Sequence, residues 1–431
     1  MERTVHGSAR LEATVVPPGD KSISHRAALL NAISDGQAKV ANFCVGDDRT
    51  SMLGCLRGLG VEIEESVEDG IETFTINGMG LDGLSEPSDY LYAGNSGTTM
   101  RLVSGLLASQ PFFSVITGDS SLRGRPMKRI LTPLSMMGAQ VMGRGGGSLA
   151  PLAFDGGGLH GIEYEMPVAS AQLKSCILIA GLFSEGETSV IQPAESRDHT
   201  ERMMASMGAD VDKDGLRLTV RRPSRLASLD IQVPCDISGA AFWLVAGAAH
   251  PNARITVQGV GINPSRTGVL DVLRDMGANI AVENVREVGN EPSADLVVET
   301  SNLRGVEISG DVIPRVIDEL PVLAVAASQA AGQTVIRDAS ELRVKESDRI
   351  AATVNGLVEL GAKVRETEDG MIIEGGSKLK GAEVESFGDH RIAMSMAIAG
   401  LIAGGATTIG DSEAADVSYP TFWGELENAK A

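Results

Sequence analysis

Six apolar stretches rich in alanine, glycine and leucine recur along the chain, and each of them follows a short polar stop. The six are "GDKSISHRAALLNA", "GNSGTTMRLVSGLLA", "VASAQLKSCILIAGL", "CDISGAAFWLVAGAA", "VIDELPVLAVAASQAAG" and "GDHRIAMSMAIAGLIAG". A polar residue before an apolar run is typical of a helix N-terminus, and small residues all round a helix allow close packing. The pattern therefore predicts six helices that are buried on most sides.

A second phrase recurs between these stretches, in which a helix-like segment ends at a glycine and a strand-like run follows. Its copies are "GLGVEI", "MMGAQV", "SMGADV", "DMGANI" and "ELGAKV", with Gly60, Gly138, Gly208, Gly277 and Gly361 at the break. Glycine is the preferred residue just after a helix, so each copy predicts a helix end followed by a strand. The glycines lie 78, 70, 69 and 84 residues apart, which gives six units of about 70 residues, the last without its final strand.

The alternation of helices, strands and hairpins predicts an α/β protein with two similar halves. "VVPPGD" at 15–20 and "IQVPCD" at 231–236 look alike, each reading as a strand that proline ends just before a repeat helix. We therefore expect crossovers there, with one domain at 21–235, a second at 1–20 plus 236–431, three units in each, and a cleft between them. An elongated solenoid scaffold is the alternative, but its repeats are usually 20–50 residues long and more uniform.

The polar residues at the six helix starts differ from one another where a pure scaffold would keep them alike. Lys21 and Arg26 crowd the first turns of the first helix, although the positive end of a helix favours an anion. If the repeats stack equivalently, the helix starts gather at one location that binds anions and also carries carboxylates. The other candidates there are Ser22, Asn95, Gly97, Ser170, Gln172, Lys174, Asp318, Glu319, Asp389 and Arg391.

Two basic segments add further candidates, "SLRGRPM" with Arg123 and Arg125, and "LRVKESDRI" with Lys345, Glu346 and Arg349. A solvated charged face is the alternative for both, and i,i+4 pairing within the second is compatible with its sequence. "PPGDKS" is not a P-loop, because Asp20 separates its glycine from the lysine. His25 and His390 lack companions at metal-ligand spacing, so we expect structural roles for them and no metal site.

Composition narrows the class of protein. The net charge of −20 argues against nucleic acid or an acidic membrane as a partner, because either would need a broad basic face. Cys44, Cys55, Cys176 and Cys235 form no CxxC pair, so reduced thiols are expected. The polar N-terminal sequence and the lack of an apolar run of ~18 residues predict a soluble, cytoplasmic protein.

Several motifs together resemble the 5-enolpyruvylshikimate-3-phosphate synthase family, and two have the wording of its class II bacterial branch. They are "GDKSISHRA", "GNSGTTMRL", "RPM", "SAQLKS", "SRDHTERM", "IDELPVLA", "LRVKESDR" and "GDHRIAM", in the family's order from about residue 5 to 425. The resemblance implies two domains of three βαβαββ units each, in the inside-out α/β barrel of the enolpyruvyl transferases. It also implies enolpyruvyl transfer from phosphoenolpyruvate to the 5-hydroxyl of shikimate 3-phosphate, in the pathway to aromatic amino acids.

The resemblance assigns roles residue by residue, without a metal or organic cofactor and with a monomer expected. Asp318 would be the base for the 5-hydroxyl, Glu346 would exchange protons with the methylene carbon, and Lys21 would be a cationic acid. Shikimate 3-phosphate would be held by Lys21, Ser22, Arg26, Ser170, Gln172, Arg197, Asp318 and Lys345. Phosphoenolpyruvate would be held by Lys21, Asn95, Gly97, Arg125, Gln172, Arg349 and Arg391.

Some positions depart from the family pattern, and two alternatives stay open. Val417 stands where many members have a lysine, Ala171 where many have serine, and Glu341 where asparagine is frequent. UDP-N-acetylglucosamine enolpyruvyl transferase shares the architecture, but it has an asparagine after the first lysine and a reactive loop cysteine, and this chain has neither feature. The second alternative is a non-catalytic anion-binding scaffold on the same fold.

Overall fold

The six predicted apolar helices are present, and the side chains along most of each are buried. The computed structural model describes residues 1–68, 70–288 and 290–430. The helices are α1 (Lys21–Ala32), α3 (Gly97–Leu107), α6 (Ala171–Gly181), α8 (Ile237–Ala249), α11 (Leu320–Gln329) and α13 (His390–Ile402). Aspartate or serine caps five of them through the side chain, at Asp20, Ser96, Ser170, Asp236 and Asp389. These polar stops satisfy backbone N–H groups that a helix leaves unpaired at its start.

A second set of helices ends at the recurring glycines, as the sequence predicts. This set comprises α2 (Asp47–Gly58), α4 (Lys128–Met136), α7 (His199–Ser206), α9 (Gly268–Asp275) and α12 (Arg349–Glu359). Gly60, Gly138, Gly208, Gly277 and Gly361 follow them with φ of +91°, +99°, +85°, +93° and +86°. Because residues with side chains rarely adopt this conformation, glycine ends each helix and turns the chain into a strand.

The strands of the described residues form six open sheets, none of them a closed barrel. Three are β14 (Ile231–Gln232)–β3 (Asp35–Ala41)–β5 (Ile71–Met79)–β4 (Glu62–Glu68), β6 (Leu91–Tyr92)–β7 (Phe113–Thr117)–β9 (Leu149–Asp155)–β8 (Gln140–Gly143) and β10 (Glu163–Glu165)–β11 (Glu187–Ile191)–β13 (Arg217–Arg221)–β12 (Asp210–Asp214). The others are β2 (Leu11–Val15)–β15 (Ala253–Gly261)–β17 (Glu291–Glu299)–β16 (Asn279–Val288), β18 (Glu307–Ile308)–β19 (Gln333–Ile336)–β21 (Met371–Glu374)–β20 (Lys363–Glu366) and β22 (Glu383–Glu385)–β23 (Ala406–Gly410)–β1 (Arg3–His6).

Each sheet begins with a parallel pair, and an antiparallel strand follows that pair. A helix joins the two parallel strands within four of the sheets, which is the connection that a parallel pair needs. In the sheets that begin with β2 and β14, no single helix joins the two parallel strands. In the chain, β2 is followed by α1 and β14 by α8, whereas their parallel partners are β15 and β3. The sixth unit takes β1 from the start of the chain as its third strand.

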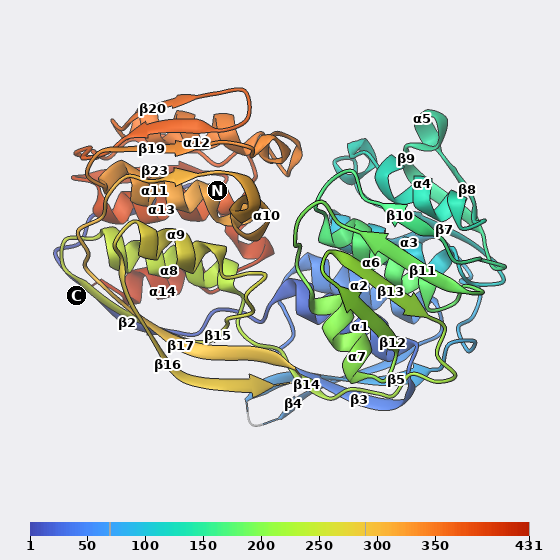
Figure 1. Cartoon of the computed structure of the whole chain (residues 1–431). Helices are drawn as coiled ribbons and strands as arrows, with labels where there is room; N and C mark the ends of the chain where they lie inside the picture. Colours follow the sequence, from blue (N-terminus) through green and yellow to red (C-terminus); the bar gives the residue numbers. More distant parts are fainter. Residues whose placement is uncertain (69, 289, 431) are drawn as a thin grey trace. The chain divides into compact units, whose positions relative to one another are not determined.

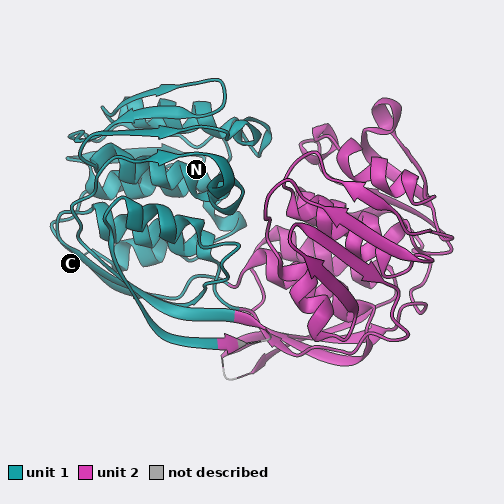
Figure 2. Cartoon of the chain, viewed as in Figure 1, with its two compact units in different colours: residues 1–18, 234–286, 292–431 teal, residues 19–233, 287–291 magenta. Residues whose placement is uncertain are grey.

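The chain divides into two units, shown in different colours in Figure 2. Unit 1 comprises 1–18, 234–286 and 292–431, and unit 2 comprises 19–233 and 287–291. In unit 1 the helices α8, α11 and α13 pack on one another, with sheets on the outside (Figure 1). In unit 2 the helices α1, α3 and α6 are likewise buried. The α/β fold predicted from the sequence is confirmed.

The remaining helical elements are short, and the longest of them is the seven-residue helix α14 near the end of the chain. They are α5 (Arg144–Gly147), α10 (Ile313–Val316), α14 (Phe422–Asn428), η1 (Leu122–Gly124), η2 (Gly310–Val312), η3 (Ile317–Glu319), η4 (Ser340–Val344) and η5 (Ser412–Val417). Within the described ranges, every helix is too short or too polar to cross a membrane. Cys44, Cys55, Cys176 and Cys235 are buried free thiols.

Candidate functional site

Candidates of unit 2 lie at the starts of α1, α3 and α6, as the six-unit pattern predicts, while Arg125 and Arg197 lie on segments outside these helices. Lys21 opens α1, and its ammonium lies 2.5 Å from Oδ2 of Asp48 at the start of α2. Burial works against ionisation of Asp48, but Lys21 outweighs it and lowers the pKa of this carboxyl to about 2. The Lys21 side chain keeps 39% of its surface exposed, so its charge is paired yet still accessible to a ligand.

Arg26 is a buried guanidinium one turn further along α1. It donates to the backbone oxygen of Ser22 at 2.9 Å, to Thr200 at 2.6 Å and to Ser175 at 2.8 Å. Burial, and then the charge of Arg197, lower the pKa of Arg26 to about 10. Arg197 in turn donates to the hydroxyl of Ser22 at 3.3 Å. Two guanidinium groups therefore converge on the first turn of α1, an arrangement that favours an anion carrying two charges.

Polar groups at the start of α3 are joined to the start of α6. Asn95 accepts a hydrogen bond from Arg125 at 2.5 Å and donates to Asp119 at 2.7 Å. Gln172 accepts from Arg101 at 2.5 Å and donates to the hydroxyl of Thr98 at 3.0 Å.

Gly97 and Ser170 occupy the starts of these two helices. A Cβ on Gly97 would lie 2.9 Å from an Arg101 nitrogen and 3.6 Å from an Arg125 nitrogen. The lack of a side chain at Gly97 therefore lets two guanidinium groups lie close to the start of α3. Ser170 caps α6 by accepting from the backbone of Leu173 at 3.4 Å.

Arg349 is the centre of the candidate site in unit 1. It is 1% exposed and donates to Asp389 at 2.8 Å, to Glu346 at 2.6 Å and to Asp318 at 3.3 Å. Burial disfavours its charge, but the surrounding carboxylates, Asp389 first, raise the pKa of Arg349 above its usual value. Arg349 in turn overcomes the burial of Asp389 and lowers the pKa of that carboxyl. The two predicted catalytic carboxylates, Asp318 and Glu346, therefore share one buried cation.

Further cations surround this group. The ammonium of Lys345 lies 3.6 Å from Oδ1 of Asp318 and 3.7 Å from Glu341, its i,i+4 neighbour. Arg391, at the start of α13, lies 3.8 Å from Oε1 of Glu319. Charges inside "LRVKESDRI" do pair, Glu346 with Arg349 and Arg343 with Asp348, although at spacings of three and five residues and not four. Arg349 also reaches beyond the segment to Asp318 and Asp389.

The two histidines expected to be structural lie near these helix starts, His25 buried in α1 and His390 partly exposed as the first residue of α13. Burial lowers the pKa of His25 to about 3, and burial together with Arg391 lowers the pKa of His390 to about 4. Both rings are therefore neutral at pH 7. Among the described residues, His, Cys, Asp and Glu side chains form no group of three that could hold a metal ion.

Two residues that contact the site candidates, and the surroundings of Val417, were not predicted from the sequence. Asp48 and Arg101 were not singled out, although Arg101 lies one helical turn after Gly97 and spacing could have identified it. Asp48 had no such signal, because its pairing with Lys21 depends on how α1 and α2 pack. Val417, at the position of the family's frequent lysine, lies in η5 and is 39% exposed.

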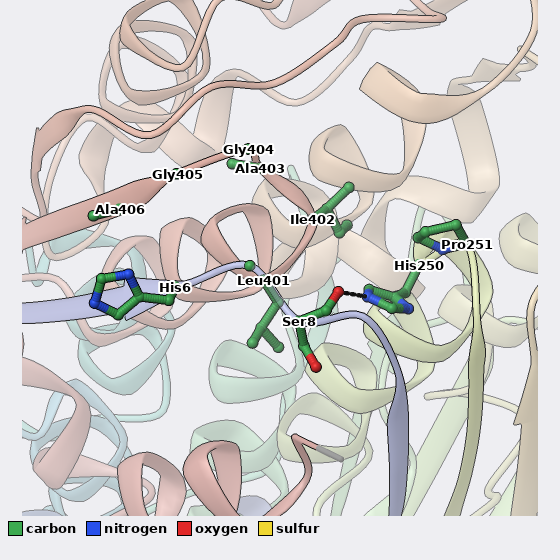
Figure 3. A pocket seen from close by; sticks show the side chains of 11 residues that line it. His6, Ser8, His250, Pro251, Leu401, Ile402, Ala403, Gly404, Gly405 and Ala406 are labelled. Atoms are coloured by element: carbon green, nitrogen blue, oxygen red, sulfur yellow. Dashed lines mark hydrogen bonds between the residues drawn. The ribbon is translucent and has the colours of Figure 1, made fainter.

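A separate pocket in unit 1 lies away from the charged helix starts. Figure 3 shows its lining, which includes His6, Ser8, His250 and residues 401–406. A ring nitrogen of His250 lies 3.0 Å from the backbone oxygen of Ser8. The pocket adjoins the C-terminal ends of α8 and α13, opposite to the ends that carry Asp236 and Arg391. None of the predicted site residues lines it.

Comparison with known proteins identifies the family. The family model described as EPSP synthase (3-phosphoshikimate 1-carboxyvinyltransferase) matches residues 5–426. Relatives named 3-phosphoshikimate 1-carboxyvinyltransferase are 52% identical in Bacillus cereus, over 99% of each chain, and 53% identical in Herpetosiphon aurantiacus, over 98% of each. An EPSP synthase structure from Acinetobacter baumannii has a TM-score of 0.89 and 46% identity, covering 100% of this chain and 98% of its own. The resemblance seen in the sequence motifs is confirmed, and the chain belongs to the EPSP synthase family.

Proposed function

We propose that this protein transfers the enolpyruvyl group of phosphoenolpyruvate to the 5-hydroxyl of shikimate 3-phosphate and releases phosphate. The names of its relatives support this activity. The observation that carries the mechanism is the set of carboxylates around buried Arg349, with Lys345 beside Asp318. A carboxylate held ionised by cations suits removal of a proton next to anionic substrates, which is the role proposed for Asp318.

Shikimate 3-phosphate is the ligand we assign to the start of α1 and its neighbours. Its phosphate monoester fits the convergence of Arg26 and Arg197 on Ser22, because guanidinium groups bind phosphate oxygens in pairs. The full proposed set is Lys21, Ser22, Arg26, Ser170, Gln172, Arg197, Asp318 and Lys345.

Phosphoenolpyruvate is assigned to the groups around Gly97 and to two arginines of unit 1. Arg349 would reach it by exchanging a carboxylate, and we propose that it exchanges Asp318, which it contacts through a single hydrogen bond of 3.3 Å, whereas it contacts Asp389 through two. Asp318 would thereby gain an unshared lone pair when the second substrate arrives. The proposed set is Lys21, Asn95, Gly97, Arg125, Gln172, Arg349 and Arg391.

The reaction proceeds by addition and elimination. Asp318, as a carboxylate, removes the 5-hydroxyl proton as the oxygen bonds to C2 of phosphoenolpyruvate, and Glu346, which must enter this step protonated, delivers its proton to C3 and becomes a carboxylate. In the second stage Glu346 takes a proton back from C3, and the C2–O bond to phosphate breaks. Lys21, accessible in spite of its contact with Asp48, supplies positive charge and a proton to the leaving phosphate. No metal or organic cofactor is needed for these steps.

We propose domains at 21–235 and at 1–20 plus 236–431, each of which contributes residues to the proposed ligand sets. A monomer in the cytoplasm, without a nucleic-acid partner, fits the net charge of −20. UDP-N-acetylglucosamine is a less favoured acceptor, because the relatives are named 3-phosphoshikimate 1-carboxyvinyltransferase.

Deuterium incorporation tests the addition–elimination route. In D2O with both substrates, the wild-type protein should place deuterium on the methylene carbon of the product. Glu346→Gln should abolish this exchange, while shikimate 3-phosphate still binds. Product formation without any methylene deuterium would contradict the proposal.

A further inference from the structure

Lys174 is a fully buried lysine to which the proposed mechanism gives no role. It lies in the first turn of α6, and its side chain is 0% exposed. Its ammonium donates to Oε1 of Glu201 at 2.7 Å and to the backbone oxygen of Ser196 at 3.2 Å. Burial lowers the pKa of Lys174, and Glu201 opposes that shift. The ammonium thus reaches protein acceptors and has no surface with which to touch a ligand.

A buried ion pair of this kind is a poor device for stability. Removing two charges from water is costly, and a protein with apolar residues of similar volume in place of the pair is often equally stable. The ammonium instead fixes the position of the segment, because it binds the backbone oxygen of Ser196 before Arg197 and the carboxylate of Glu201 after it. Ser196 comes one residue before Arg197 in the chain, and Glu201 lies in the first turn of α7.

Side-chain contacts hold the segment that carries Arg197, including those of Asp198 with Arg202 and of His199 with Glu291. Residues 195–198 have no helix or strand, and α7 begins without a side-chain cap from its N-cap residue. Thr200 is fixed separately, since it accepts from Arg26 at 2.6 Å and lies 2.6 Å from the hydroxyl of Ser175. Lys174 and Ser175 are neighbours on α6, so one turn of that helix holds the segment through both Ser196 and Thr200.

We propose that Lys174 is a positioning residue for Arg197. It fixes the Ser196–Glu201 segment so that the Arg197 guanidinium lies beside Ser22, ready for the phosphate monoester of the acceptor substrate. The proposal rests on the proposed function, since it takes Arg197 to be a ligand of shikimate 3-phosphate. A bound phosphate needs well-placed donors, and loss of their placement weakens binding without removing a contact.

Binding measurements on variants test the proposal. Lys174→Met removes the ammonium and keeps the length of the side chain. Arg197→Ala removes the guanidinium that we expect to bind the phosphate. Calorimetric titration with shikimate 3-phosphate should show affinity about 10-fold weaker for Lys174→Met and about 10- to 100-fold weaker for Arg197→Ala. The combination of both should bind within about 3-fold of Arg197→Ala alone, because coupled residues are not additive. Titration with shikimate, which lacks the phosphate, should be unchanged by Lys174→Met.

Controls separate positioning from a loss of stability. Lys174→Met leaves Glu201 buried without its cation, so Lys174→Met with Glu201→Gln removes both charges. This pair should restore the melting temperature but keep the roughly 10-fold loss in affinity. Ser184→Ala, which removes a buried hydroxyl bonded to Thr188 just after α6, should leave affinity unchanged.

The outcomes distinguish this inference from the proposed function. Affinity within 2-fold of wild type for the uncharged pair, or additive losses for Lys174→Met and Arg197→Ala, would overturn the positioning role. Unchanged affinity in Arg197→Ala would instead contradict the proposed ligand set, and with it the basis of the inference.

Discussion

Replacing Asp318 with asparagine separates its proposed role as a base from a purely structural role. The substitution keeps the size of the side chain and an oxygen that can accept from Arg349, but removes the basicity. Arg349 keeps its contacts with Asp389 at 2.8 Å and Glu346 at 2.6 Å, so its charge stays compensated. The main loss is the negative charge of Asp318, which faces Arg349 at 3.3 Å and Lys345 at 3.6 Å.

These contacts set the expected magnitudes. A hydrogen bond to a charged group contributes about 1.5–3 kcal/mol, and the amide oxygen retains part of it, so we expect a loss of about 1–2 kcal/mol. For a unit of this size that lowers the melting temperature by roughly 2–8 °C. Loss of a general base should lower turnover by about 10²–10⁴-fold. Shikimate 3-phosphate should still bind within about 10-fold of wild type.

The assay combines steady-state phosphate release, calorimetric titration with shikimate 3-phosphate and thermal unfolding. Asp311→Asn is the matched control, because this exposed carboxylate in η2 lies only seven residues earlier and should change none of the three. Wild-type turnover in Asp318→Asn would refute the base assignment. Low turnover with a melting temperature lowered by 15 °C or more would show that Asp318 acts through the fold instead.

Other expected outcomes follow from the same contacts. Arg349→Met leaves a cluster of carboxylates without their buried cation and should destabilise the protein by about 3–5 kcal/mol, measured by urea unfolding; unchanged stability would contradict the central role of this guanidinium. Gly97→Ala places a methyl group against Arg101 and should raise the KM for phosphoenolpyruvate by about 10-fold or more with little change in stability; an unaltered KM would move the pocket elsewhere. The pKa values of His25 and His390 are about 3 and 4 in the folded protein and near 6.5 in the unfolded chain. The unfolded chain therefore binds more protons between these limits. As a result, the contribution of the two histidines to stability is fully present above pH 6.5 and falls as the pH drops towards 4 and then 3. Each histidine should contribute a slope of about 1.4 kcal/mol per pH unit, and His25→Gln should lower the slope of urea unfolding energies between pH 6 and pH 4.5; an identical slope would contradict its neutral burial.

Local signals made the helix boundaries of the fold predictable from the sequence. The capping residues Asp20 and Ser96 satisfy backbone groups within a few positions of themselves, and Gly60 adopts a conformation that other residues avoid. Such effects depend on neighbours in the chain, so the pattern alone indicates them. The pairing of β1 with β23 carries no comparable signal, because it joins strands at opposite ends of the chain.

The partners of the site residues were less predictable than the residues themselves. Glu346 lies three residues before Arg349, a spacing that suggests an ion pair, but Asp389 lies 40 residues beyond Arg349. That contact depends on how α12 packs against α13. The anchoring of Arg197 by Lys174 is likewise a product of helix packing, which one sequence does not record.

Phosphate release with defined acceptors tests the central claim most directly. The purified protein is incubated with phosphoenolpyruvate and either shikimate 3-phosphate, UDP-N-acetylglucosamine or no acceptor, and inorganic phosphate is measured with time. The account predicts continuous release with shikimate 3-phosphate, at least 100-fold faster than with the nucleotide sugar or without an acceptor. Equal release in all three reactions, or release only with UDP-N-acetylglucosamine, would contradict it.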